Sequence, residues 1–152
     1  MCVKQVPEAE AQISIDETGD WVMIGGAAEY RMNRFDECAV EEAVLIKEAH
    51  ADTVVDVITV GPERAEATVR RAMGMGADNG AHILTEGEGY QDAFATAGAI
   101  AGYAREKHYD LILTGAMSED LMQGQVGQLV AAHLDVACIS NTIHAELALD
   151  LS

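Results

Sequence analysis

The 152 residues include 26 acidic side chains against 9 lysines and arginines, which gives a formal charge of −17 at pH 7. This charge excludes nucleic acid as a partner, because phosphate backbones are bound by clustered Lys and Arg, and it argues against an anionic membrane surface. The length fits one domain, the hydrophobic fraction of 49% fits a folded core, and no apolar run reaches the ~20 residues of a membrane span.

The three cysteines, Cys2, Cys38 and Cys138, are odd in number and far apart, so they indicate neither a disulfide framework nor a zinc site. Reduced thiols predict a cytoplasmic protein. The acidity is typical both of an ordinary solvated surface and of a salt-adapted organism, and composition does not separate the two.

Short, β-branched apolar runs alternate with helical patterns along the chain. The runs that predict strands are residues 1–6, 53–60, 81–84, 111–114 and 137–140, and a further strand opens within 142–149. The patterns that predict helices are residues 36–50, 62–75, 90–107 and 124–134. Asn33 is expected to cap the first helix, with Asp36 three residues on as in a capping box, and Gly76 is expected to end the second.

An early segment interrupts this alternation. Residues 12–16 and 21–24 flank a turn and predict a small β-hairpin insertion outside the main sheet. The remaining alternation of strand and helix predicts βαβ units, and therefore an α/β fold whose open, mostly parallel sheet has helices on both faces. In such a sheet, ligands bind beyond the carboxyl ends of the strands.

The segment 114–127 is the most informative of those expected at this edge, because it is longer than a strand-to-helix connection needs. It ends in Gly124-x-x-Gly127 at the start of a predicted helix. Glycines there let a ligand approach the backbone, and the free N–H groups favour a phosphate. An ordinary mobile loop with a glycine-bearing helix cap fits the same pattern, and spacing alone leaves both interpretations open.

Other nucleotide and catalytic motifs are incomplete. Gly74-x-Gly76 begins like a dinucleotide fingerprint, but Asn79 stands where the third glycine belongs, and the motif follows a helix instead of a strand. No lysine follows a glycine pair as a P-loop requires. The five histidines lie at neither metal nor catalytic spacing, and Ser118 has no histidine partner, so neither a metal site nor a hydrolytic triad is predicted.

Several segments, in the correct order, resemble the N-terminal part of the electron-transfer flavoprotein beta subunit. They are Val3-Lys4-Gln5-Val6-Pro7 with the Ile-Ser-Ile-Asp hairpin, residues 31–43 with their Met-Asn-Arg-Phe-Asp-Glu run, Val60-Gly61-Pro62, residues 71–78, and residues 109–115 with 125–127. The resemblance covers essentially the whole chain.

The resemblance implies an adenine-nucleotide-binding, Rossmann-like fold and one subunit of an αβ heterodimer, with an alpha subunit as partner and FAD as cofactor. Such a complex shuttles electrons from dehydrogenases to a quinone reductase or a related acceptor, and no catalytic side chain is expected in the beta subunit. The beta subunit itself holds AMP, or a second FAD in electron-bifurcating members, and both stay open here. By position-matching, the nucleotide site comprises Cys2, Asn33, Val60, Gly115, Met117, Ser118, Asp120, Gly124, Gln125, Val126 and Gly127.

The chain also departs from the family pattern. Many members carry Thr where this chain has Val126, so phosphate contacts are expected to rely on backbone N–H groups. Family beta subunits continue well beyond this length, which implies a single nucleotide-binding domain, residues 1–152, cut at both ends. The alternative is a stand-alone adenine-nucleotide module like a universal stress protein, but the later Gly-Ser/Thr of that family's motif is missing after Gly127.

Overall fold

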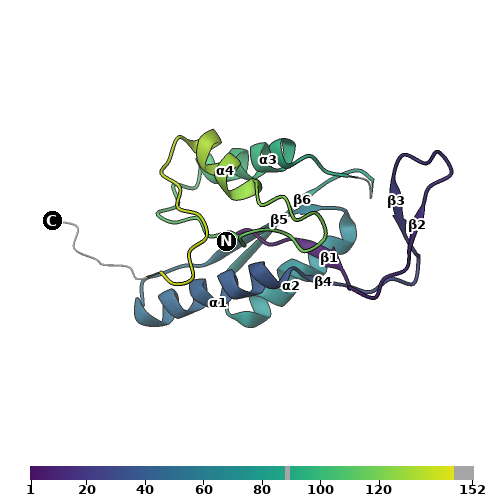
Figure 1. The fold of residues 1–152 in the computed structure, drawn as a ribbon. Helices are drawn as coiled ribbons and strands as arrows, with labels where there is room; N and C mark the ends of the chain where they lie inside the picture. The colour runs from purple at the N-terminus through teal and green to yellow at the C-terminus, as the bar shows by residue number, and fades with distance from the viewer. Residues whose placement is uncertain (88–89, 146–152) are drawn as a thin grey trace.

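The computed structural model describes residues 1–87 and 90–145, and it shows a mixed α/β chain, as predicted (Figure 1). The strands are β1 (Gln5–Pro7), β2 (Ile13–Ile15), β3 (Val22–Ile24), β4 (Tyr30–Met32), β5 (Asp56–Gly61) and β6 (Asn79–Leu84). The helices are α1 (Arg34–Ala49), α2 (Glu66–Met75), α3 (Ala93–Arg105) and α4 (Val126–Leu134), and the 3-10 turn η1 (Glu63–Ala65) precedes α2.

The longest strands, β5 and β6, pair in parallel, with Ile58 opposite Ala81. Isolated parallel bridges continue this pairing on the other side of β5, where Cys2 bridges both Ile58 and Thr114. The parallel segments therefore follow one another in space from Thr114 through Cys2 and β5 to β6. After Cys2 the chain leaves this group, and β1 pairs antiparallel with β4.

Side chains that alternate along the parallel segments bury two separate cores. Val3 and Val57 pack with Val40 of α1 and Val69 of α2 in one apolar cluster. In the second cluster, Cys2 and Ile58 of the parallel segments pack with Ala97 and Ile100 of α3 and with Val130 of α4. Successive residues of a strand point to opposite faces, so helices cover both faces of the parallel segments, as expected (Figure 1).

Local sequence signals set the ends of the helices. The predicted ends at residues 50, 75, 107 and 134 lie within two residues of the observed ones. Gly76 adopts a φ of 128° and ends α2 as predicted. The Asp92 side chain caps α3, with its Oδ2 accepting a hydrogen bond from the Ala95 N–H at 3.2 Å, and α3 therefore begins later than the predicted residue 90.

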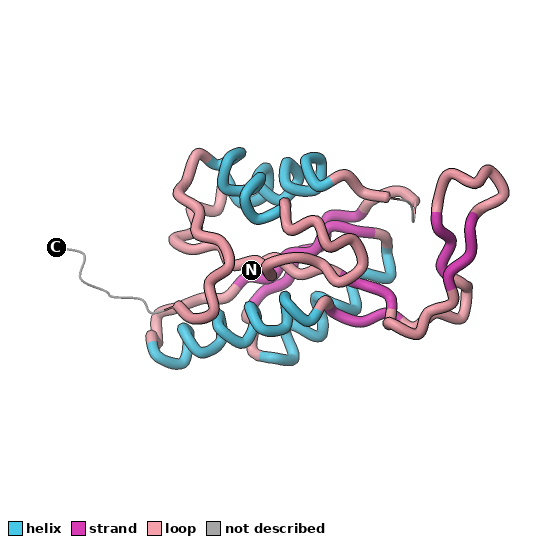
Figure 2. The backbone as a smooth tube through the Cα atoms, viewed as in Figure 1, coloured by secondary structure: helices cyan, strands magenta, loops and turns pink. Residues whose placement is uncertain are grey.

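The predicted hairpin is present as β2 and β3, with Ile13 opposite Ile24 and Ile15 opposite Val22. It projects from one end of the molecule, away from the helices (Figures 1 and 2). None of the described residues of β2 and β3 belongs to either apolar cluster.

Several of the predicted strands are wrong. Residues 111–114 contribute only the bridge at Thr114, and residues 137–140 are irregular, with Ile139 83% exposed. The predicted strand 1–6 is divided into the bridge at Cys2 and the short β1. A strand needs a hydrogen-bonded neighbour, and β-branched composition by itself does not supply one.

Two further strand predictions have different outcomes. Residues 142–145 are irregular, and the rest of the strand predicted within 142–149 lies outside the described residues. Strand β4 was not predicted, because three residues carry no periodic signal.

Within residues 1–87 and 90–145, no helix combines the length and the apolar character that crossing a membrane requires.

Candidate functional site

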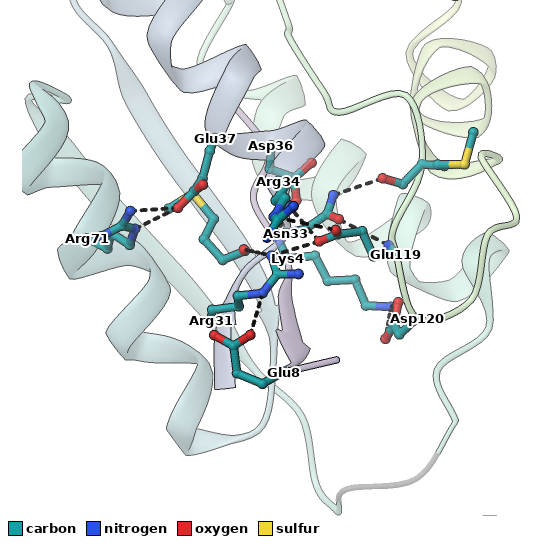
Figure 3. A network of polar contacts seen from close by, with 12 residues as sticks. Lys4, Glu8, Arg31, Asn33, Arg34, Asp36, Glu37, Arg71, Glu119 and Asp120 are labelled. Atoms are coloured by element: carbon teal, nitrogen blue, oxygen red, sulfur yellow. Dashed lines mark hydrogen bonds and ion pairs between the residues drawn. The ribbon is translucent and has the colours of Figure 1, made fainter. Parts of the chain in front are cut away.

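The loop at residues 115–124 follows Thr114 and leads toward α4. It therefore lies where a parallel segment ends, which is the edge at which α/β sheets bind ligands. The loop contains no helix or strand, yet side chains from Lys4 and from residues 31–36 hold it in place (Figure 3). These tertiary contacts add to a local turn in which the Met122 N–H donates to the Ser118 carbonyl at 2.8 Å.

Asn33 precedes α1, is 1% exposed, and binds the loop through both ends of its amide. Its Nδ2 donates to the Met117 carbonyl at 2.8 Å, and its Oδ1 accepts from the Glu119 N–H at 3.1 Å. Asn33 occupies the N-cap position of α1 but makes no side-chain capping bond, so the predicted capping box is wrong. The peptide groups of the loop occupy both polar ends of the side chain instead.

Asp36 is a second buried anchor. Its Oδ2 accepts from the Lys4 N–H at 2.7 Å, and its Oδ1 accepts from the Gly115 N–H at 3.1 Å. Burial raises the pKa of this carboxyl group to about 6, although the backbone hydrogen bonds oppose the rise. Gly115 is needed here, because a Cβ would collide with Asp36 Oδ1 and would lie 2.9 Å from the backbone of Phe35.

Ion pairs add to this tether. Lys4 Nζ lies 2.7 Å from Asp120 Oδ1 and donates to Ser118 Oγ at 3.3 Å. The Arg31 guanidinium lies 2.8 Å from Glu119, and its hydrogen bond holds the pKa of that carboxyl group below the ordinary value. Partly exposed pairs of this kind contribute only ~0.2–1 kcal/mol each, so they orient the loop more than they stabilise the fold.

The loop ends at the amino end of α4. Gly124 adopts a φ of 60°, and a Cβ there would lie 3.0 Å from the Ala116 carbonyl oxygen. Gln125 is the N-cap residue and makes no side-chain capping bond. The first N–H groups of a helix have no acceptor within it, so they form a set of free donors beside Gly124. At Gly127, a Cβ would lie 2.7 Å from Thr114 Oγ1, so α4 begins in close contact with the end of the parallel segment.

An open groove of about 500 Å³ lies beside this helix start. It is lined by Asp92, Phe94, Gly124, Gln125, Gln128 and Leu129. The groove therefore lies between the amino ends of α3 and α4, and its volume suits a small organic ligand.

The structure brings most of the predicted site residues together, from Asn33 and Gly115 through the loop to Val126 and Gly127. Three of the predicted residues also contact the α3/α4 cluster: the Cys2 side chain is buried in it, and Val60 and Val126 pack against it. Burial raises the pKa of the Cys2 thiol to about 11. The Cys2 side chain is therefore part of the core.

Sequence reasoning missed the role of Lys4, Arg31, Asp36 and Glu119 in holding the loop. Each is a charged residue near the end of a predicted element, which is a common pattern, and only the fold shows which acid meets which base. Among the described residues, no group of three or more His, Cys, Asp or Glu side chains is placed to hold a metal ion.

Comparison with known proteins identifies the family. The electron transfer flavoprotein domain matches residues 20–151 of the chain. The chain belongs to the electron transfer flavoprotein family. The electron transfer flavoprotein subunit beta of Bradyrhizobium diazoefficiens is 36% identical over 132 residues, which cover 87% of this chain and 52% of that protein.

Two other relatives of this electron transfer flavoprotein chain are informative. The subunit beta of Bacillus subtilis is 34% identical over 146 residues, covering 95% of this chain and 55% of the relative. The caffeyl-CoA reductase-Etf complex subunit CarD of Acetobacterium woodii is 33% identical over 142 residues, which cover 92% of this chain and 53% of that protein. The resemblance to beta subunits is confirmed, and the universal-stress alternative is not favoured. The chain spans about half the length of the curated relatives it matches.

Proposed function

We propose that this chain is the nucleotide-binding part of an electron transfer flavoprotein beta subunit, with an adenine-nucleotide-binding, Rossmann-like fold. In this proposal it forms an αβ heterodimer with an alpha subunit in the cytoplasm. The heterodimer passes electrons from dehydrogenases to a quinone reductase or a related acceptor. FAD supplies the redox chemistry when bound, and this chain supplies binding and orientation but no catalytic side chain. Family membership and the similarity to named beta subunits support this proposal.

The observation that carries the proposal is the tethered loop that presents the amino end of α4. The backbone N–H groups of Gly124, Gln125, Val126 and Gly127 would hold the phosphate of an adenine nucleotide, because neutral donors and the helix dipole favour an anion. The two acids of the loop would otherwise repel a phosphate. Asp120 and Glu119 are each already paired with a cation, at 2.7 Å and 2.8 Å respectively.

The nucleotide of this site is AMP or a second FAD. Both carry the same adenylate phosphate, so the donors at α4 serve either one. The groove between the amino ends of α3 and α4 continues from Gly124, and it offers space for the parts of a larger nucleotide beyond that phosphate.

Co-expression with an electron transfer flavoprotein alpha subunit tests the proposal. We expect a yellow complex that releases FAD on denaturation, together with either AMP or a second equivalent of FAD, identified by chromatography. A complex that releases neither flavin nor AMP contradicts the proposal.

A variant tests the phosphate contact itself. Val126→Thr adds a hydroxyl donor at the first residue of α4, and we expect it to raise the affinity for AMP about tenfold, because a hydrogen bond to a charged group contributes about 1.5 kcal/mol. Val136→Thr is the matched control, since Val136 is 56% exposed and lies beyond the other end of α4, and its AMP affinity should be unchanged.

A further inference from the structure

The second half of the loop, residues 121–124, has an unusual backbone. Met122 adopts a φ of 56° and Gly124 a φ of 60°, so two left-handed residues flank Gln123. A methionine rarely takes this conformation, and it persists where surrounding contacts hold it. Because this half of the loop leads directly to the free donors at the amino end of α4, the contacts that fix it also fix those donors.

The second half of the loop is tethered to a different part of the molecule from the first half. The buried and ionic anchors of the loop reach residues 115–120. Gln123 instead contacts the segment before α3, where its Nε2 donates a hydrogen bond to the Tyr90 hydroxyl group at 3.2 Å. A hydrogen bond between exposed side chains competes with water, so it orients the loop when its acceptor is already held in place.

Trp21 holds this acceptor. It is the single tryptophan of the chain, it precedes β3, and its ring packs against the Tyr90 ring with centroids 5.2 Å apart and an interplanar angle of 56°. A tilted aromatic pair of this kind is favourable beyond the apolar area that it buries. The hairpin therefore supports the Tyr90 ring from one side, while the hydroxyl group of that ring reaches the loop.

The contact between Tyr90 and Gln123 also joins the two walls of the groove between α3 and α4. Asp92 and Gly124 both line the groove. Asp92 follows Tyr90 by two residues and caps α3, and Gly124 directly follows Gln123. The hydrogen bond consequently ties the start of α3 to the segment that leads into α4.

We propose that Tyr90 is a positioning residue for the nucleotide. Supported by Trp21, it holds Gln123, and therefore Gly124 and the donors of α4, against the start of α3. The proposal rests on the proposed function, because it names a residue that prepares the nucleotide site described there. Since Trp21 lies at the other end of the same contacts, nucleotide binding should also change the surroundings of its ring.

The test measures the affinity of the subunit for AMP and for FAD by titration calorimetry. Tyr90→Phe keeps the ring on Trp21 but removes the hydroxyl acceptor, and Gln123→Ala removes the donor. We expect each variant to bind the nucleotide that the parent takes about three- to tenfold more weakly, as the loss of one hydrogen bond gives. The double variant should bind as weakly as either single variant, because both changes remove the same hydrogen bond.

Tyr30→Phe is the matched control for the removal of a hydroxyl group. Tyr30 lies in β4, where the Arg64 guanidinium covers its ring, and it does not line the groove. The nucleotide affinity of this variant should stay within about twofold of the parent.

The fluorescence of Trp21 gives a readout that a merely structural role would not change. AMP should alter the emission of Trp21 in the parent, and Gln123→Ala should abolish this response, because the loop no longer contacts Tyr90. The urea midpoints of the parent and both single variants should agree, since Tyr90 and Gln123 are exposed. An unchanged Trp21 response in Gln123→Ala would contradict the proposal.

The outcomes separate this inference from the proposed function. If the parent binds neither AMP nor FAD, alone or together with the alpha subunit, the proposed function fails and this inference fails with it. If the parent binds a nucleotide and both single variants bind it equally well, Tyr90 does not position the site, and the proposed function stands. If the two losses add in the double variant, Tyr90 and Gln123 act separately, and their contact is not what positions the loop.

Discussion

The loop at residues 115–124 contains no helix or strand, and the β2–β3 hairpin is regular along both strands, yet the loop is the better anchored of the two. Asn33 and Asp36, which are 1% and 6% exposed, bind the backbone of the loop with three hydrogen bonds, and Asp36 also accepts one from the Lys4 N–H. The hairpin, by contrast, leaves most of one apolar face in solvent.

The difference shows that regular secondary structure and anchoring are separate properties. A buried amide or carboxyl group must be satisfied, so losing its partner costs free energy. Replacing an exposed isoleucine costs little free energy of unfolding, because its side chain is not buried in the folded subunit. Substitutions should therefore destabilise the fold at the loop, and should change its stability little at the exposed hairpin.

Among these substitutions, Gly115→Ala should lower the free energy of unfolding the most. The added Cβ meets Asp36 and the backbone of Phe35, which cannot move aside without shifting the start of α1, so we expect a loss of about 3 kcal/mol in the free energy of unfolding. Urea denaturation measures it. Gly102→Ala, in α3, is the matched control with the opposite sign: nothing lies within 4 Å of its added Cβ, and alanine should stabilise the helix by ~0.5–1 kcal/mol. Equal effects at both glycines would contradict the tight contact at Gly115.

Asn33→Ala should cause the second-largest loss in the free energy of unfolding. It removes both side-chain bonds to the loop and leaves the Met117 carbonyl and the Glu119 N–H without these partners, so we expect a loss of about 2–3 kcal/mol. Hydrogen exchange should also show faster exchange of the Glu119 amide. Asn79→Ala is the control, because Asn79 is exposed and its side chain donates one described hydrogen bond, to Asp56 Oδ1, so the loss in the free energy of unfolding should stay below about 1 kcal/mol. A loop amide that exchanges at the parental rate in the Asn33 variant would show that the loop is held by other contacts.

Asp36 makes the anchoring of the loop depend on pH. Its pKa in the folded chain, about 6, is above the ordinary value of 3.8, so the folded state binds the proton more tightly than the unfolded state does. The resulting stabilisation is complete below pH ~4 and is lost as the pH rises through about 6. Relative to Asp36→Asn, the parent should therefore lose about 2 kcal/mol of stability between pH 4.5 and pH 7, by linkage.

A second carboxyl group provides the control for this pH dependence. The hydrogen bond from Lys47 lowers the pKa of Asp78, so its contribution is present above the ordinary carboxyl range and is lost as the pH falls. The difference between the parent and Asp78→Asn should accordingly change with pH in the opposite direction. Parallel curves for the two variants would show that burial does not control Asp36.

The exposed isoleucines of β2 should give the smallest effect on the free energy of unfolding. Ile13→Thr with Ile15→Thr should change the free energy of unfolding of the isolated subunit by less than about 0.5 kcal/mol, because both side chains are exposed. Thermal unfolding followed by circular dichroism measures the change. A loss above 1 kcal/mol would mean that Ile13 and Ile15 already stabilise the fold, and the contrast with the loop would disappear.

Much of the fold follows from local signals. The helix ends at Gly76 and Leu134, the buried strand β5 and the hairpin could all be predicted, because periodicity and turn residues act over a few neighbouring positions. The glycines of residues 124–127 likewise marked the loop. The strand expected at residues 137–140 could not be judged in this way, because pairing depends on a neighbour that the local sequence does not reveal.

By itself, the sequence determined the alternation of elements, the hairpin, the position of the glycine-bearing loop and the resemblance to electron transfer flavoprotein beta subunits. Only the tertiary structure decided what holds that loop. Asn33 and Met117 are 84 residues apart, and Lys4 and Asp120 are 116 residues apart. Contacts of this kind depend on how the parallel segments bring distant parts of the chain to one edge, and no local pattern encodes which polar side chains meet there.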